Sequence, residues 1–153
     1  MVDRSKVGYI LPPLHYEVEK GQLRFFSKVV GETDPVYFDE AAAKAAGYRS
    51  ILAPPTFCFS CLRGSAEEMP YVTVLDMSED ELGRSLHGEQ SFEFHEPVCA
   101  GDHLTITEKI VDIFEKKSGA LLFVLTETCL VNQLDQLVAR MESSLIIKAE
   151  PAA

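Results

Sequence analysis

Apolar residues follow a helical period in the first half of the chain. Residues 17–30 repeat them at helical spacing, which predicts an amphipathic helix. The stripe expected to face the core consists of Val18, Gln22, Phe25, Phe26 and Val29. After the segment GETDP, residues 38–47 (FDEAAAKAAG) predict a short helix with acids in its first turn and Gly47 as its stop signal.

A third helix is predicted after Pro54 and Pro55. Thr56 is a plausible N-cap for a helix through FCFSCLRGSA, residues 57–66. This segment is apolar around most of its circumference, so we expect it to be buried centrally. Cys58 and Cys61 form a C-x-x-C, which is compatible with a redox pair or half of a zinc site. Because free cysteine behaves as a small buried hydrophobe, we predict instead that both thiols pack in the core.

The second half of the chain alternates apolar and polar residues, as strands do. Alternation in QSFEFHEPV and HLTITEKIVDIF predicts two strands, and the phase shift at Ile110–Val111 predicts a bulge or strong twist. Residues 117–119 predict a turn, and residues 120–131 and 137–148 predict two long strands joined across NQLDQ. Helices followed by about four antiparallel strands indicate an α+β fold with one long helix buried against a curved sheet.

Composition narrows the class of protein. A length of 153 residues fits one domain with a substantial core. The net charge of −10 argues against a nucleic-acid surface, which needs clustered cations. The N-terminus lacks the unbroken apolar run of a signal peptide, and no apolar segment approaches the length of a membrane span. We therefore expect a cytoplasmic protein that binds neither nucleic acid nor membrane.

Two motif-bearing segments and the pair of final strands carry a family resemblance. The segments are residues 15–57, which include GETDPVYF and ILAPPTF, and residues 86–104, which read LHGEQSFEFHEPVCAGDHL. In this order they resemble the MaoC-like hydratase/dehydratases, and most closely the N-terminal type. That type occurs as a small subunit or as the first half of a longer protein, and is related to type-2 enoyl-CoA hydratases and (3R)-hydroxyacyl-thioester dehydratases.

The resemblance implies a fold and an assembly. Residues 1–153 are expected to form a single hot-dog domain, in which a curved antiparallel sheet wraps a long central helix. Hot-dog domains typically dimerise with their sheets joined edge to edge, which also covers exposed strand edges. The relatives are lyases of fatty acid metabolism, acting on acyl thioesters of coenzyme A (CoA) or acyl carrier protein.

The segment at residues 31–37 departs from the family's catalytic loop. Catalytic members read G-D-x-N-P-x-H there, and their Asp and His act as a general acid–base pair. This chain keeps the glycine and proline but has Glu32, Asp34 and Tyr37 at the Asp, Asn and His places. A tyrosine hydroxyl, with a pKa of about 10, is a poor base at neutral pH, so we do not expect dyad catalysis from this loop alone. N-terminal-type domains commonly lack the pair while their partner retains it.

Other catalytic candidates remain open. Glu32 is either a displaced catalytic acid or a solvated loop carboxylate. Period-two alternation would put His87 and Glu89 on one strand face, with Gly88 between them permitting close backbone approach. They are either a substitute pair beside a pocket or residues of an edge or dimer contact.

Binding residues follow from the same resemblance. The candidates for substrate binding are Tyr37, Asp34, Pro55, Thr56, Phe57 and Gly88, and those for the CoA phosphates are Lys44, Arg49 and Arg63. His15 is expected in a loop, His95 and His103 at the surface, and Gly101-Asp102 in a turn. The spacing of the histidines predicts no metal site, and no cofactor is expected beyond the thioester itself.

Three functions are therefore considered. The leading one is a subunit of an enoyl-thioester hydratase or (3R)-hydroxyacyl-thioester dehydratase that supplies the acyl tunnel to a catalytic hot-dog partner. The second is a self-sufficient homodimeric hydratase using Glu32 or His87 and Glu89. The third is a non-catalytic acyl-CoA binding module. A thioesterase is disfavoured by the hydratase-like frame of residues 31–37, although the hot-dog fold also hosts that reaction.

Overall fold

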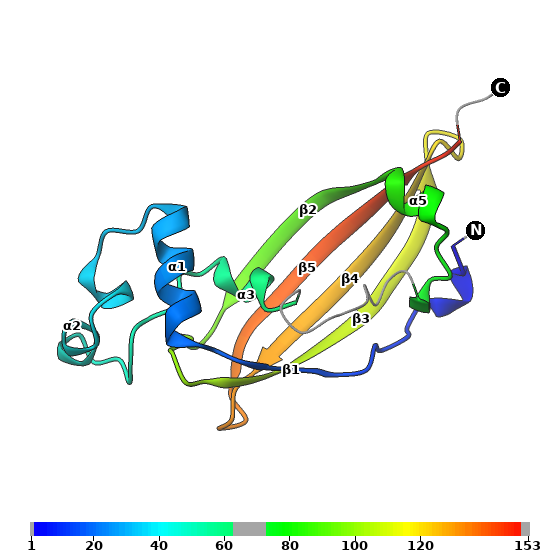
Figure 1. Ribbon diagram of the computed structural model, residues 1–153. Helices are drawn as coiled ribbons and strands as arrows, with labels where there is room; N and C mark the ends of the chain where they lie inside the picture. The colour runs from blue at the N-terminus through cyan, green and yellow to red at the C-terminus, as the bar shows by residue number, and fades with distance from the viewer. Residues whose placement is uncertain (1, 63–72, 151–153) are drawn as a thin grey trace.

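A five-stranded antiparallel sheet forms the main layer of the protein (Figure 1). The computed structural model describes residues 2–62 and 73–150. The strands are β1 (Leu14–Glu17), β2 (Ser85–Phe94), β3 (His103–Lys116), β4 (Leu121–Val131) and β5 (Leu137–Lys148), arranged in the order β1-β3-β4-β5-β2. The helices are η1 (Arg4–Lys6), α1 (Lys20–Val30), η2 (Pro35–Tyr37), α2 (Glu40–Ala45), α3 (Phe57–Ser60) and α5 (Glu79–Gly83). Helices α1 and α2 lie beyond one end of the sheet (Figure 1).

The predicted strands are confirmed, with one addition. The register of β3 against β4 shifts between Ile110 and Asp112, where the apolar phase changes in the sequence. Residues 117–119 form the expected turn, all with positive φ. His15 was expected in a loop but lies in β1, which pairs with residues 103–106 of β3. Four residues are too few to show a clear alternation, so β1 escaped prediction.

Helix α1 forms, but only part of its predicted core-facing stripe packs with the core. Val18 and Phe26 pack there, while Phe25 and Val29 do not. The buried residues of α1 are Leu23 and Ser27, whereas Phe25 and Val29 are 71% and 66% exposed. Val18 is fully buried but precedes the helix. Apolar residues lie on two sides of α1, and helical spacing alone does not say which side packs.

The two following helices begin as predicted. Helix α2 is capped by Asp39, whose side chain accepts the Ala42 N–H at 2.7 Å, and Gly47 follows it with φ 93°. Helix α3 starts directly after Thr56, but the Thr56 side chain makes no capping hydrogen bond. It is helical through Ser60, and the part of the predicted helix beyond residue 62 lies outside the described residues.

A buried carboxylate ties the loops at one end of the sheet together. Asp102 is 0% exposed and accepts hydrogen bonds from both terminal nitrogens of Arg49, at 2.7 and 3.0 Å. The backbone N–H of Cys99 and the Gln133 amide donate to it at 2.9 and 3.0 Å. Gly101-Asp102 is the turn expected from sequence, with Gly101 at φ 88°, but the role of the carboxylate was not foreseen.

These bonds hold two distant segments in contact. The Ala53 N–H donates to the Val98 carbonyl at 2.8 Å, and the Ala100 N–H donates to the Ile51 carbonyl at 3.0 Å. Burial by itself would raise the pKa of Asp102, but its hydrogen bonds from Arg49, Cys99 and Gln133 hold that pKa below its ordinary value. The carboxylate is therefore charged at neutral pH and keeps the residue 51–53 strip against residues 98–100.

Replacing Asp102 by Asn should lower the free energy of unfolding by about 2–4 kcal/mol at pH 7, because a buried charge pair loses one partner. The folded-state pKa lies below the unfolded one. The pair therefore contributes stability above about pH 4, and that contribution is lost as the pH falls through the folded-state pKa. Urea unfolding between pH 7 and pH 3 should show the gap between wild type and variant closing.

The matched control is Asp80→Asn. Asp80 also pairs with an arginine, Arg84, but its side chain is 69% exposed. Such a surface pair contributes less than about 1 kcal/mol. Equal effects of the two substitutions, or a gap for Asp102 that does not change with pH, would contradict the assigned role.

Candidate functional site

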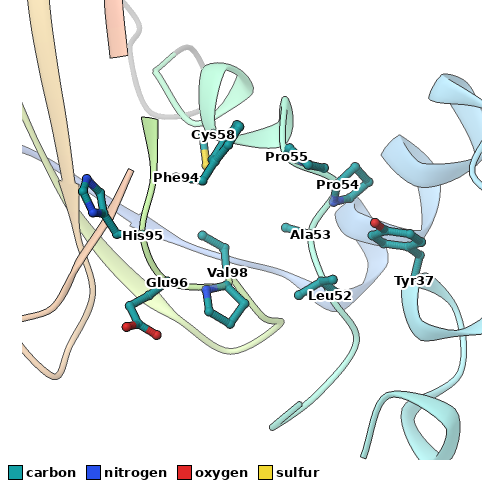
Figure 2. Close-up of a pocket in the computed structure, with 11 residues that line it drawn as sticks. Tyr37, Leu52, Ala53, Pro54, Pro55, Cys58, Phe94, His95, Glu96 and Val98 are labelled. Atoms are coloured by element: carbon teal, nitrogen blue, oxygen red, sulfur yellow. The ribbon is translucent and has the colours of Figure 1, made fainter. Parts of the chain in front are cut away.

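A mostly apolar groove of about 190 Å³ opens beside α3. It is lined by Tyr37, the segment 52–55, Cys58 and the segment 94–98. In Figure 2 the 52–55 segment lies between Tyr37 on one side and Phe94 and Val98 on the other. The groove therefore brings together the altered catalytic loop, the ILAPPTF motif and the FHEPV motif, which are far apart in the sequence.

Local hydrogen bonds place Tyr37 at the groove. Gly31 ends α1 with φ 83°, a left-handed conformation that suits glycine. Asp34 then caps η2, its side chain accepting the Val36 N–H at 3.0 Å. The Val36 carbonyl in turn accepts the Leu52 N–H at 3.0 Å, which joins this loop to the groove wall. Asp34 thus shapes the loop, and it does not line the groove.

The Tyr37 hydroxyl is held in its neutral form. Burial raises its pKa above the ordinary value, and the nearby carboxylates of Glu32 and Asp34 raise it further. Tyr37 is therefore protonated at physiological pH and can donate a hydrogen bond into the groove. Glu32 is half-buried and close enough to influence Tyr37, but it does not line the groove.

The other catalytic candidates, His87 and Glu89, lie on β2 outside the groove lining. His87 precedes the groove-lining Phe94 by seven residues in β2. Its ring contacts the edge of Phe59, with centroids 5.3 Å apart. The register against β5 shifts between His87 and Gln90, and the Glu89 N–H donates to Ser144 Oγ at 2.7 Å. The period-two alternation that placed His87 and Glu89 on one face therefore does not continue through this irregularity.

Gly88 packs closely against side chains of β5, whereas a close approach of backbone was expected from sequence. A Cβ at this position would lie 2.4 Å from Ser144 Oγ and 2.8 Å from Ile146 Cδ1. It does not line the groove.

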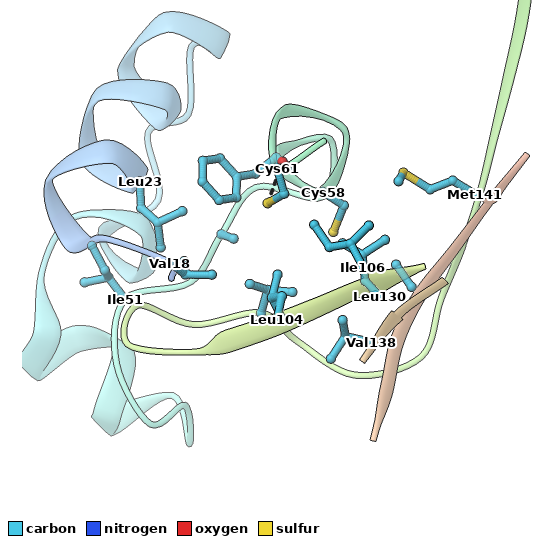
Figure 3. Close-up of a cluster of buried hydrophobic side chains, with 14 residues drawn as sticks. Val18, Leu23, Ile51, Cys58, Cys61, Leu104, Ile106, Leu130, Val138 and Met141 are labelled. Carbon is cyan, nitrogen blue, oxygen red and sulfur yellow. Dashed lines mark hydrogen bonds between the residues drawn. The ribbon is translucent and has the colours of Figure 1, made fainter. Parts of the chain in front are cut away.

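The residues at the start of α3 divide between groove and core. Pro55 lines the groove, Thr56 is exposed and outside it, and Phe57 is buried in the core. Figure 3 shows Cys58 and Cys61 among the side chains of that core, which confirms their predicted packing. Burial raises the pKa of Cys58 to about 11 and also raises that of Cys61. All four cysteines are free.

The candidate phosphate contacts are partly engaged with the protein itself. Lys44 pairs with Glu40 at 2.8 Å while its side chain stays 60% exposed. Arg49 is bound to Asp102, although half of its side chain is exposed. Arg63 lies outside the described residues.

Several groove residues were not singled out from sequence. Leu52, Ala53 and Cys58 line it, as does the 94–98 segment. The only available signal was the family motif that contains them. His95 and His103 are exposed, as expected, and His95 also lies in the groove lining. Within residues 2–62 and 73–150, no three His, Cys, Asp or Glu side chains gather as a metal site would need, and no helix has the length and apolarity to cross a membrane.

Comparison with known proteins gives the family. Residues 5–141 match the model of the FAS1-like, dehydratase domain region. The chain belongs to this family. A UPF0336 protein of Streptomyces avermitilis is 41% identical over 113 residues, which cover 73% of each chain.

Solved structures agree with the family. The HadBC (3R-hydroxyacyl-ACP dehydratase) complex of Mycobacterium tuberculosis contains a chain with a TM-score of 0.79 and 27% identity, covering 92% of this chain and 96% of that one. A MaoC-like dehydratase has a TM-score of 0.75 and 24% identity, and this chain spans 43% of its length. The MaoC-like resemblance and the hot-dog fold are thereby confirmed.

Substituting Gly88 by Ala should destabilise the FAS1-like dehydratase-family chain by about 1–2 kcal/mol, since the added methyl group overlaps Ser144 and Ile146. Gly21→Ala in α1 is the matched control. A Cβ there meets nothing within 4 Å, so this change should stabilise the chain by about 0.5–1 kcal/mol. Thermal unfolding of both variants measures the difference, and a neutral Gly88→Ala would refute the close packing.

Proposed function

We propose that this chain is the substrate-holding subunit of an enoyl-thioester hydratase or (3R)-hydroxyacyl-thioester dehydratase that works with a catalytic hot-dog partner. The observation that carries the proposal is Tyr37, a neutral hydrogen-bond donor in an apolar groove where catalytic relatives are expected to have a histidine.

The chemistry of hydration explains why the tyrosine at position 37 favours a substrate-holding role over a catalytic one. One group must take a proton from water and another must deliver a proton to the α carbon, and both work best with a pKa near the operating pH. The raised pKa of Tyr37 makes it unsuited to accept that proton. Glu32 is the nearest candidate carboxylate by sequence, and it does not line the groove. The histidine and glutamate that do line the groove, His95 and Glu96, are exposed and lie on the opposite side from Tyr37 (Figure 2). The loop at residues 31–37 therefore suits binding better than acid–base catalysis.

The groove fits part of an acyl thioester. Its walls are mainly the apolar side chains of Leu52, Pro54, Phe94 and Val98. Its volume of about 190 Å³ is smaller than that of a complete small-molecule site, which typically starts at about 300 Å³. A short length of acyl chain or the thioester itself would occupy this space, and the Tyr37 hydroxyl would donate to its carbonyl.

The rest of the site is expected from a second subunit. Strand β2 is an edge strand of the sheet. Its last residue, Phe94, is 50% exposed. An unpaired edge is a ready template for another strand. A hot-dog partner added to β2 would enlarge the groove and supply the acid–base pair that residues 31–37 lack. The HadBC relative, a two-protein dehydratase complex by its name, supports this assembly.

The free cysteines are consistent with a protein of a reducing compartment. Cys58, Cys61, Cys99 and Cys129 are all free, as is usual for cytoplasmic proteins. We infer that the thioester is carried by CoA or by acyl carrier protein, and that the reaction belongs to fatty acid metabolism.

Loss of the enoyl-thioester ultraviolet chromophore tests this function. The purified chain alone should bind trans-2-octenoyl-CoA without turning it over, and turnover should appear once the catalytic partner is co-expressed. In that complex Tyr37→Phe should lower kcat/KM by about tenfold or more, because a fixed donor is lost. Tyr9→Phe, a matched change at an exposed tyrosine of the N-terminal segment, should leave it unchanged.

Two results would contradict the proposal. Turnover by the chain alone that vanishes in Glu32→Gln or in His87→Ala would identify a self-sufficient hydratase. Binding without turnover in every combination of partners would identify a non-catalytic acyl-CoA binding module.

A further inference from the structure

Helix α1 presents an apolar row to solvent. Phe25 is 71% exposed and Val29, one turn further, is 66% exposed. Val30, next to it, is 46% exposed. The packing of the domain does not use this side of α1, because the residues that α1 buries are Leu23 and Ser27. A large exposed aromatic beside exposed valines is typical of an interaction surface.

A cationic row runs beside the apolar one. Lys20, Arg24 and Lys28 are spaced by four residues, so they follow one side of the helix. The eleven residues of α1 include no acid, in a chain that has 24 acidic and 14 basic residues. We call the two rows together the α1 face, made of Lys20, Arg24, Phe25, Lys28 and Val29.

Part of this positive charge is uncompensated. Lys20 pairs with Glu40. Arg24 uses only its Nε, which donates to the Phe38 carbonyl at 3.0 Å. Lys28 forms no ion pair with any carboxylate in residues 2–62 and 73–150. Arg24 and Lys28 are thus available to a partner with negative charge.

The position of the α1 face ties it to the groove. Helix α1 ends at Val30, and residues 31–37 lead directly to Tyr37 in the groove lining. Figure 1 shows α1 at the same end of the sheet as α3, whose Cys58 also lines the groove. A molecule bound to α1 would therefore be next to the place where the thioester is expected.

We propose that the α1 face docks an acidic carrier protein that delivers the acyl thioester to the groove, an inference that rests on the proposed function. A chain of net charge −10 repels an acidic protein from most of its surface, so a local excess of cations is where such a protein can approach. The apolar row distinguishes a protein from CoA. Helix α1 is about 16 Å long, and covering Phe25 and Val29 needs a partner surface of similar length.

Binding of holo acyl carrier protein without an acyl chain, followed by fluorescence anisotropy, tests the docking itself. The full-length chain should bind it with an affinity that falls as salt is added. Lys28→Glu and Phe25→Ser should each weaken this binding by about tenfold. Both residues are exposed, so each change should lower the unfolding temperature by only a few degrees, most of it for Lys28→Glu, which puts an acid in the last turn of α1.

Lys117→Glu is the matched control. It makes the same charge change in the turn between β3 and β4, at the far end of the sheet from α1 (Figure 1), and should alter the affinity by less than about twofold. Trans-2-octenoyl-CoA, measured in parallel, should bind the α1 variants as it binds wild type, because the α1 face is outside the groove.

The remaining outcomes overturn the inference in distinguishable ways. Equal binding of carrier protein by the α1 and Lys117 variants, or no binding of it while the enoyl-CoA binds normally, would remove the docking role and leave the proposed function intact. Loss of the catalytic hot-dog partner from the α1 variants would make the face a subunit interface instead. Failure of both ligands to bind would remove the proposed function as well.

Discussion

The hydrogen bonds to Asp102 decide where the walls of the groove lie. A fully buried carboxylate is tolerated only because Arg49, the Cys99 N–H and Gln133 all donate to it. Those donors belong to three separate segments, and satisfying one charge fixes all three at once. The strip at 51–53 is thereby held against 98–100, and both continue into the groove lining.

In the loop at residues 31–37, some residues determine the shape of the loop and another determines its chemistry. Asp34 and Gly31 retain the shape of a catalytic loop, and the loop still delivers residue 37 to the groove. What has changed is the chemistry delivered, from an expected histidine to a tyrosine kept neutral by burial and by Glu32. The loop therefore keeps its geometry without the aspartate and histidine expected of catalytic relatives, and the edge strand β2 is where the proposed partner would add.

Local sequence patterns predicted most helices and strands, but they did not predict contacts between residues far apart in the sequence. The phase shift at Ile110 marked a bulge because alternation is a property of a few neighbouring residues. The hydrogen bond from Arg49 to Asp102 joins residues 53 positions apart. From sequence, Asp102 was therefore predicted only as a turn residue. The packing side of α1 was predicted only in part for a similar reason, since Phe25 and Leu23 fit a helical period equally well. The altered loop at Tyr37 was recognised from sequence, but of its apolar neighbours in the groove only Pro55 was named as a binding residue.

The central claim is that the motif segments form one thioester-binding groove around Tyr37. Backbone NMR of the isotope-labelled chain, titrated with trans-2-octenoyl-CoA, tests it most directly. The account predicts that the largest shift changes cluster at Tyr37 and at residues 52–58 and 94–98. Changes centred instead on His87 and Glu89, which lie nearer the start of β2 and outside the groove lining, would contradict it and place the site elsewhere on that strand.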